Sequence, residues 1–134
     1  MLDNETKDIP MSYKIEWIGN NAHVFFEGDI DFDELNKANG ELYGDARFDL
    51  MDYAIFDLIN AREFNITEHE MLMISALDKS ASRWNEKLKL ACISEDKNEK
   101  VKQMLEHYVH LMKDNKWTIK LFSNLSEAVK WCNN

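Results

Sequence analysis

The chain has 134 residues, of which 45% are hydrophobic and 31% are charged, a composition that suits one folded domain rather than a disordered tail. Its formal net charge of -9 argues against a nucleic-acid-binding protein, because phosphate binding needs a basic surface. No apolar run approaches the length of a membrane span, and residues 1–10 are polar where a signal peptide would be apolar. We therefore expect a cytoplasmic protein with no membrane insertion, in which residues 1–11 form a flexible leader and residues 12–134 form one domain.

The first part of the domain predicts two strands and a helix. Met11–Ile18 alternates in polarity as a strand does, residues 19–21 supply a tight turn, and Ala22–Glu27 returns as a second strand. These strands should form an antiparallel hairpin. Apolar residues at helical spacing then predict a helix over Phe32–Leu42, which Gly44 and Asp45 close.

The central part predicts a buried strand, a turn and a long helix. Tyr53–Ile59 is a nearly continuous apolar run, as expected of a strand covered on both faces. Asn60–Ile66 reads as a polar turn at the carboxyl end of that strand, where open α/β sheets usually place binding sites. Thr67 and Glu70 form a capping box that begins a helix over Thr67–Asn85. One stripe of this helix comprises Met73, Leu77, Ala81 and Trp84.

The last part continues the alternation of strands and helices. Leu88–Ile93 is an apolar strand, and Val101–Met112 repeats apolar residues at the spacing of an amphipathic helix. A final strand over Trp117–Phe122 precedes a short helix over Leu125–Cys132. The order ββαβαβαβα predicts a single α/β domain with helices packed on a mixed sheet, in which the opening hairpin adds an antiparallel edge strand.

The order of elements, the run Ile55–Leu58 and the polar turn before Thr67 resemble a STAS domain, the fold of SpoIIAA-type anti-anti-sigma factors. A narrower similarity, to the small bacterial SpoIIAA-like proteins grouped with STAS and CRAL-TRIO lipid-binding folds, rests on Leu77, Asp78, Lys79, Ser80, Trp84, Asn85, Leu88 and Lys89. The resemblance covers about residues 12–131. It implies a non-enzymatic protein-interaction or regulatory module that acts through the loop before the second helix and binds a protein partner or a second copy of itself.

In regulatory members of that family, a phosphorylated serine in an Asp-Ser-Ser-Gly-like turn switches partner binding. The corresponding segment here, Asn65–His69, lacks the serine pair and the glycine. Thr67 offers the hydroxyl of this segment, which we interpret as a helix cap rather than a phosphoacceptor, and Glu68 places a fixed negative charge beside it. The candidate partner-binding or switch residues are Asn60, Arg62, Asn65, Thr67 and Glu68.

The CRAL-TRIO similarity and the methionine content suggest an alternative function, a carrier or sensor for a small apolar or lipid-like ligand. An apolar groove lined by Met71, Met73, Met104 and Met112 is the candidate site. Packing in the core is the interpretation that we favour over this groove for the methionines, and also for the four tryptophans at positions 17, 84, 117 and 131.

Other chemistry is poorly supported by the residue patterns. Asp29, Asp31 and Asp33 resemble the start of an EF-hand, but Glu34 occupies the glycine position and Gly40 the twelfth position, which calcium binding reserves for an acid. His107 and His110 are interpreted as a solvent-exposed pair, and Cys92 and Cys132 as reduced structural thiols. The group Lys79, Arg83, Lys87 and Lys89 is interpreted as a solvated helix face. We predict no catalytic residue, metal or cofactor.

Overall fold

The computed structural model describes residues 12–134, so the expected leader at residues 1–11 lies outside the described residues. The predicted order of strands and helices is confirmed, with one short 3-10 helix added. In chain order the elements are β1 (Tyr13–Ile18), β2 (Asn21–Asp31), α2 (Phe32–Gly44), η1 (Ala46–Leu50), β3 (Tyr53–Asn65), α3 (Glu68–Ala81), β4 (Lys89–Ile93), α4 (Glu99–Leu111), β5 (Thr118–Phe122) and α5 (Leu125–Cys132).

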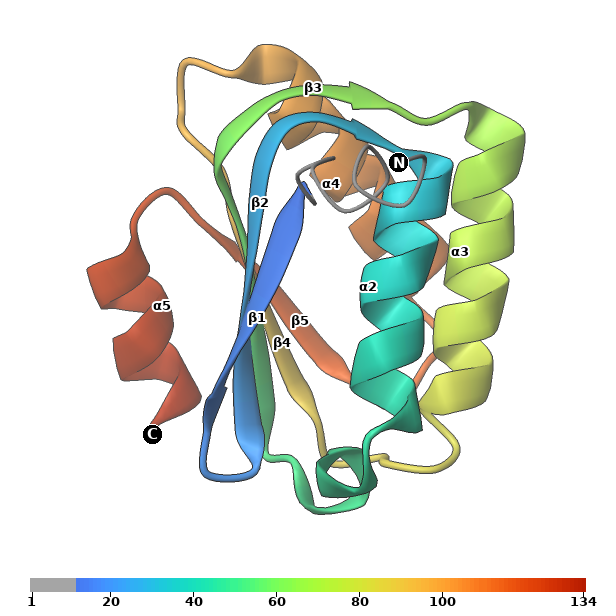
Figure 1. Ribbon diagram of the computed structural model, residues 1–134, viewed down its shortest axis with the longest axis vertical. Helices are drawn as coiled ribbons and strands as arrows, with labels where there is room; N and C mark the ends of the chain where they lie inside the picture. Colours follow the sequence, from blue (N-terminus) through green and yellow to red (C-terminus); the bar gives the residue numbers. More distant parts are fainter. Residues whose placement is uncertain (1–11) are drawn as a thin grey trace, which may run out of the picture.

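The five strands form one sheet in the order β1-β2-β3-β4-β5. β1 pairs with β2 in antiparallel orientation, and every other neighbouring pair is parallel, which confirms the mixed sheet. Helices α2, α3 and α4 cover one face of the sheet, and α5 packs on the other face (Figure 1). Within residues 12–134, no helix combines the length and the apolar character that crossing a membrane would require.

Strand β3 is longer than predicted. It continues to Asn65, where it still pairs with Asp31 at the end of β2. The ladder tolerates two register shifts, one of them next to Gly28, whose φ of 75° lies in the left-handed region that glycine adopts without strain. The prediction of a polar turn over Asn60–Ile66 is therefore wrong. The segment pairs with β2 as a strand, but its exposed polar side chains resemble the composition of a turn in the sequence.

The sheet divides the apolar core into two clusters. Leu58 of β3 packs into the larger cluster beneath α2, α3 and α4, whereas Ile55 of the same strand packs into the smaller cluster beneath α5. The predicted burial of this strand on both faces is confirmed. Cys92 belongs to the larger cluster and Cys132 to the smaller one, and both are buried free thiols.

Candidate docking surface on helix α3

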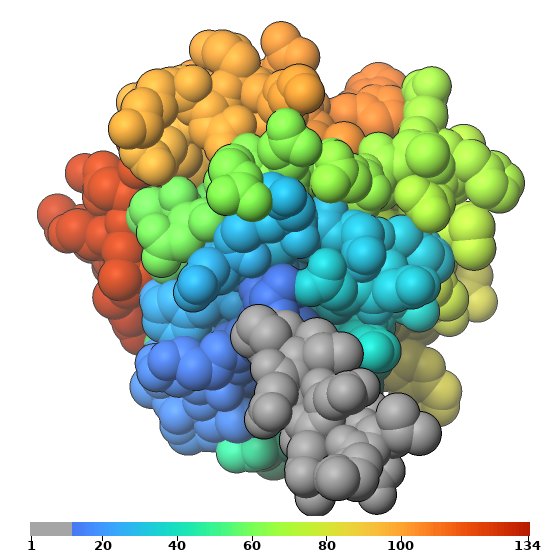
Figure 2. Space-filling model, turned by 45° about the horizontal axis from the view of Figure 1, so that its top comes forward, coloured from blue at the N-terminus to red at the C-terminus, as the bar shows by residue number. Residues whose placement is uncertain are grey.

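The residues predicted as a switch loop lie along the carboxyl half of β3 and at the start of α3. Asn60, Arg62 and Asn65 are exposed positions of the strand. Arg62 Nε donates to Asp29 Oδ1 on β2 at 2.9 Å, and this hydrogen bond lowers the pKa of Asp29. Figure 2 shows the carboxyl end of β3 in green, between α4 in orange and the end of β2 in light blue. Pairing with β2 holds the segment as part of the sheet.

The predicted capping box at the start of α3 is confirmed. Thr67 Oγ1 accepts a hydrogen bond from the Glu70 backbone N–H at 3.1 Å, and the Thr67 backbone N–H donates to Glu70 Oε1 at 2.9 Å. The threonine hydroxyl thus stabilises the helix terminus. Glu68 is exposed in the first turn, where the helix dipole favours a negative charge.

The four methionines of the predicted groove are distributed over different environments. Met71 lines a cavity in the core, and Met112 is buried. Met104 is partly buried against the larger core cluster, whereas Met73 is 42% exposed. Among residues 12–134, Met71 is the only one of these four methionines that lines the cavity.

Helix α3 presents apolar side chains to solvent. Leu77 is 51% exposed, and Trp84, in the turn after the helix, is 78% exposed. The expected core packing is therefore wrong for Trp84, although Trp117 is buried and Trp17 and Trp131 are partly buried. The inward face of the helix consists of Met71, Ile74, Ser75, Asp78 and Ala81. Helix α3 thus buries an acidic residue while it exposes part of its apolar surface.

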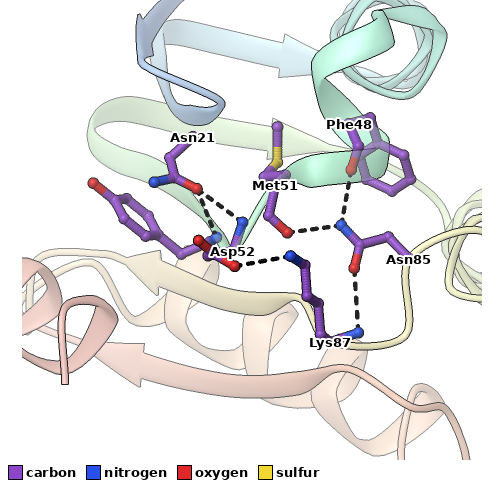
Figure 3. Close-up of polar contacts among 7 residues, drawn as sticks. Asn21, Phe48, Met51, Asp52, Asn85 and Lys87 are labelled. Atoms are coloured by element: carbon purple, nitrogen blue, oxygen red, sulfur yellow. Dashed lines mark hydrogen bonds and ion pairs between the residues drawn. The ribbon is translucent and has the colours of Figure 1, made fainter.

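The turn that carries Trp84 is held in place by Asn85, which is buried (Figure 3). Asn85 Nδ2 donates to the backbone carbonyls of Phe48 and Met51, in each case at 2.8 Å. The Asn85 backbone carbonyl accepts a hydrogen bond from Trp117 Nε1 at 2.7 Å. These bonds connect the turn to η1 and to the segment before β5. The exposed Trp84 ring therefore projects from an ordered part of the backbone.

The interpretation of Lys79, Arg83, Lys87 and Lys89 as one helix face is wrong, because α3 ends at Ala81 and Lys89 begins β4. Lys87 Nζ lies 3.0 Å from Asp52 Oδ1, as Figure 3 shows, and Lys89 Nζ donates to the Trp131 backbone carbonyl. Lys79 and Arg83 remain as exposed cations near the carboxyl end of the helix.

Asp78 lies on the inward face of α3, beneath this exposed surface. Tyr43 Oη donates to Asp78 Oδ1 at 2.8 Å, and Tyr108 Oη donates to Asp78 Oδ2 at 2.6 Å. Burial raises the pKa of Asp78 to about 6, although the two tyrosine hydrogen bonds act in the opposite direction. The pKa values of Tyr43 and Tyr108 are raised well above the usual range, mainly by burial. The network joins α2, α3 and α4, and the sequence analysis missed it because its members are far apart in the chain.

The residues weighed as metal ligands serve other contacts. Asp29 and Asp31 belong to β2, and Asp31 caps α2 by accepting from the Glu34 backbone N–H at 2.9 Å. The predicted solvent exposure is confirmed for His110, whereas His107 is partly buried, with its Nε2 atom covered 3.8 Å from Glu68 Oε1. Within residues 12–134, no three His, Cys, Asp or Glu side chains form a cluster suited to a metal ion.

A second buried polar pair lies on the face of the sheet that carries α5. His23 Nε2 is 3.0 Å from Asp57 Oδ2, and the His23 ring stacks on Phe25 with ring centroids 3.8 Å apart. The imidazole is covered by this stacking, and residue 23 is buried as a whole. We assign the pair a structural role between neighbouring strands β2 and β3.

Comparison of the chain with protein-family models and with curated proteins finds no match. The chain is thus described by its architecture, a small α/β domain with a five-stranded mixed sheet.

Proposed function

We propose that this chain is a non-enzymatic protein-interaction module that docks through the outer face of α3, defined as Leu72, Met73, Leu77 and Trp84. The proposal keeps the kind of function that the STAS and SpoIIAA-like resemblance implies. It moves the docking surface from the segment before α3 to the helix itself. The order of elements and the capped start of α3 agree with that resemblance.

The exposure of this face is the observation that carries the proposal. Leu72 is 49% exposed and Met73 42%, beside the still more exposed Leu77 and Trp84. Large apolar side chains exposed on a folded domain are typical of an interaction site, and tryptophan is enriched among the residues that dominate binding energy. The contacts of Asn85 order the Trp84 turn before any partner binds, which lowers the entropy lost on docking.

The state of the nucleophilic side chains supports a function without catalysis. Burial raises the pKa of the Cys92 thiol to about 12 and that of the Cys132 thiol to about 11, so both resist forming the reactive thiolate. The hydroxyls of Ser75 and Ser82 donate to backbone carbonyls three residues earlier in the chain.

The occupant we propose for the outer face of α3 is a second copy of the chain in antiparallel orientation. The first turn of α3 carries Glu68, whereas Lys79 and Arg83 are exposed near its other end. A two-fold axis near Ala76, midway between Glu68 and Arg83, would place the acidic end of one helix beside the basic end of the other. Such a contact is isologous, so it closes as a dimer instead of growing into a filament.

Sedimentation velocity over a range of protein concentrations tests this proposal. We expect the wild-type protein to dimerise and the Leu77→Lys variant to remain monomeric, because a charge at the centre of an apolar contact is left without a partner. Val129→Lys is the matched control, since residue 129 is 39% exposed on α5, on the opposite face of the sheet. A wild-type monomer at every concentration, or dimers of equal strength in both variants, would overturn the proposal.

Salt and charge reversal test the orientation of the helices. The dimer should persist in 1 M NaCl, because exposed ion pairs contribute only about 0 to 1 kcal/mol each and apolar burial is not screened. At low salt, Arg83→Glu should weaken the dimer, and Glu68→Lys combined with Arg83→Glu should restore it. Failure of the double variant to restore association would exclude the antiparallel arrangement.

A further inference from the structure

Helices α2 and α3 lie side by side (Figure 1), and a surface groove of about 450 Å³ runs between them. Its lining comes from α2, from η1, from α3 and from the turn after α3, and it includes Gly40, Phe48, Leu77, Ser80, Ala81 and Trp84. Leu77 and Trp84 also belong to the outer face of α3. The groove is therefore continuous with the proposed docking surface.

The outer face of α3 is too small to hold a stable dimer without neighbouring surface. It consists of four side chains, whereas a stable interface buries about 800 Å² and involves about 20 to 30 residues on each partner. A dimer that forms on α3 must therefore also cover the surface beside this helix. The groove supplies such surface, because it adds exposed positions on α2 and η1, among them Asn36, Gly40 and Asp49.

The antiparallel dimer determines which part of the second copy faces the groove. In a helix pair related by a two-fold axis, the flank of α3 that borders α2 faces the same flank of the other copy. Met73 lies on this flank, one turn before Leu77. It also lies three residues before Ala76, so an axis near Ala76 places Met73 of the second copy between the levels of Leu77 and Ser80.

The α3 side of the groove forms a hole at this level. Its residues have the spacing i, i+3, i+4 and i+7, namely Leu77, Ser80, Ala81 and Trp84. Four residues with this spacing make the hole that receives one side chain of a facing helix. The hole and the side chain opposite it therefore coincide in the antiparallel dimer.

We infer that each groove of the proposed dimer takes the Met73 side chain of the other copy. This contact rests on the proposed function and extends the interface from α3 to α2 and η1. A methionine side chain is unbranched and fills irregular apolar spaces well. Its four non-hydrogen atoms need roughly 120 Å³ if each occupies as much volume as a liquid water molecule, about 30 Å³. The groove thus also has room for part of the helix that carries this side chain.

Leu72 is the matched comparison for Met73. The two side chains are 49% and 42% exposed, but Leu72 lies on the other flank of α3. Glu68, one turn before Leu72, has its Oε1 atom 3.8 Å from His107 Nε2 on α4. The flank that carries Leu72 therefore borders α4 and not the groove, so truncation of Met73 should weaken the dimer more than truncation of Leu72.

A variant that fills the groove tests the contact. A Cβ atom added at Gly40 meets nothing within 4 Å in the part of the chain that the structure describes, and leucine favours a helix more than glycine does. Gly40→Leu should therefore fill the groove and leave the monomer folded, which amide spectra would check. Gly44→Leu is the control, because Gly44 has the same open space on α2 but does not line the groove. In sedimentation velocity, we expect Gly40→Leu to raise the dissociation constant of the dimer at least tenfold and Gly44→Leu to change it less than twofold.

Substitution of the inserted side chain gives a second readout. Met73→Ala should raise the dissociation constant several-fold, and Leu72→Ala should raise it less. In the Gly40→Leu background, Met73→Ala should have no further effect, because the methionine no longer has a groove to enter.

NMR spectra of a dimer mixed from labelled and unlabelled chains report the contact directly. The Met73 methyl group should show a nuclear Overhauser effect to the Ala81 methyl group of the other chain. Within one chain these residues are separated by roughly 12 Å along the helix, which is too far for this signal.

The outcomes separate this contact from the proposed function. A wild-type monomer at every concentration would overturn both. A wild-type dimer that Leu77→Lys disrupts would support the proposed function. In that case, an unchanged or lower dissociation constant in Gly40→Leu, or the absence of the Met73–Ala81 signal between chains, would overturn the groove contact alone.

Discussion

Replacing Asp78 by asparagine tests how the buried carboxyl group affects stability. The structure raises the pKa of Asp78 from 3.8 to about 6, mainly through burial. The folded state therefore binds this proton more tightly than the unfolded state, so the contribution of Asp78 to stability falls as pH rises between these two values. Because one pKa unit corresponds to about 1.4 kcal/mol, the ionised carboxylate at pH 8 costs about 3 kcal/mol relative to the protonated group.

The Asp78→Asn variant lacks this titration and keeps a side chain of nearly the same shape. Urea unfolding of both proteins at several values between pH 4 and pH 8 measures the effect. The free energy of unfolding of the variant minus that of the wild type should rise by about 2.4 kcal/mol across this interval, since distant carboxyl groups titrate in both proteins and cancel. A difference that stays constant with pH would refute a raised pKa. A difference that falls with pH would show that the hydrogen bonds from Tyr43 and Tyr108 outweigh burial.

Substitutions at three further positions test the contacts that hold the fold, each by urea or thermal unfolding. Asn85→Ala should cost about 3 kcal/mol, because two buried carbonyl groups lose their donor, and a loss below about 1 kcal/mol would contradict the role assigned to this side chain. Thr67→Ala should cost about 1 kcal/mol and Thr67→Ser almost nothing, so equal effects would exclude the capping hydroxyl as the cause. Ile55→Asp should abolish the cooperative transition, since an unpaired charge between the sheet and α5 costs several kcal/mol, and a melt close to that of the wild type would contradict double-sided burial.

The architecture follows from local patterns, which is why the sequence predicts it. A continuous apolar run such as Tyr53–Ile59 needs cover on both faces, and Thr67 with Glu70 identifies a helix start within four residues. The position at which β3 ends cannot be predicted from a local sequence pattern. Asn60 to Asn65 are strand because β2 continues beside them after two register shifts, and that pairing joins segments more than 30 residues apart.

The faces of α3 are ambiguous in the sequence because both carry apolar residues. Met71 and Ile74 face the core, whereas Met73 and Leu77 face solvent, and either set has helical spacing. Asp78 makes the inward face look polar. The burial of Asp78 depends on hydrogen bonds from Tyr43 and Tyr108, which are about 30 residues away in either direction. A short stretch of sequence around Asp78 therefore does not predict that it is buried. The candidate docking surface and the cavity were therefore not predictable from periodicity alone.

The concentration dependence of thermal unfolding shows whether Leu77, on the exposed face of α3, serves docking or supports the fold of the monomer. If Leu77 supports the monomer fold, Leu77→Lys should lower the melting temperature equally at every protein concentration. If it serves docking, a substitution at so exposed a position should change the stability of the monomer by no more than about 0.5 kcal/mol. Dimerisation stabilises only the folded wild type, so its melting temperature should rise with protein concentration while that of the variant stays constant. At the lowest concentration the two proteins should melt together. A gap that persists there would show that Leu77 contributes to the monomer and would remove the main argument for a docking surface.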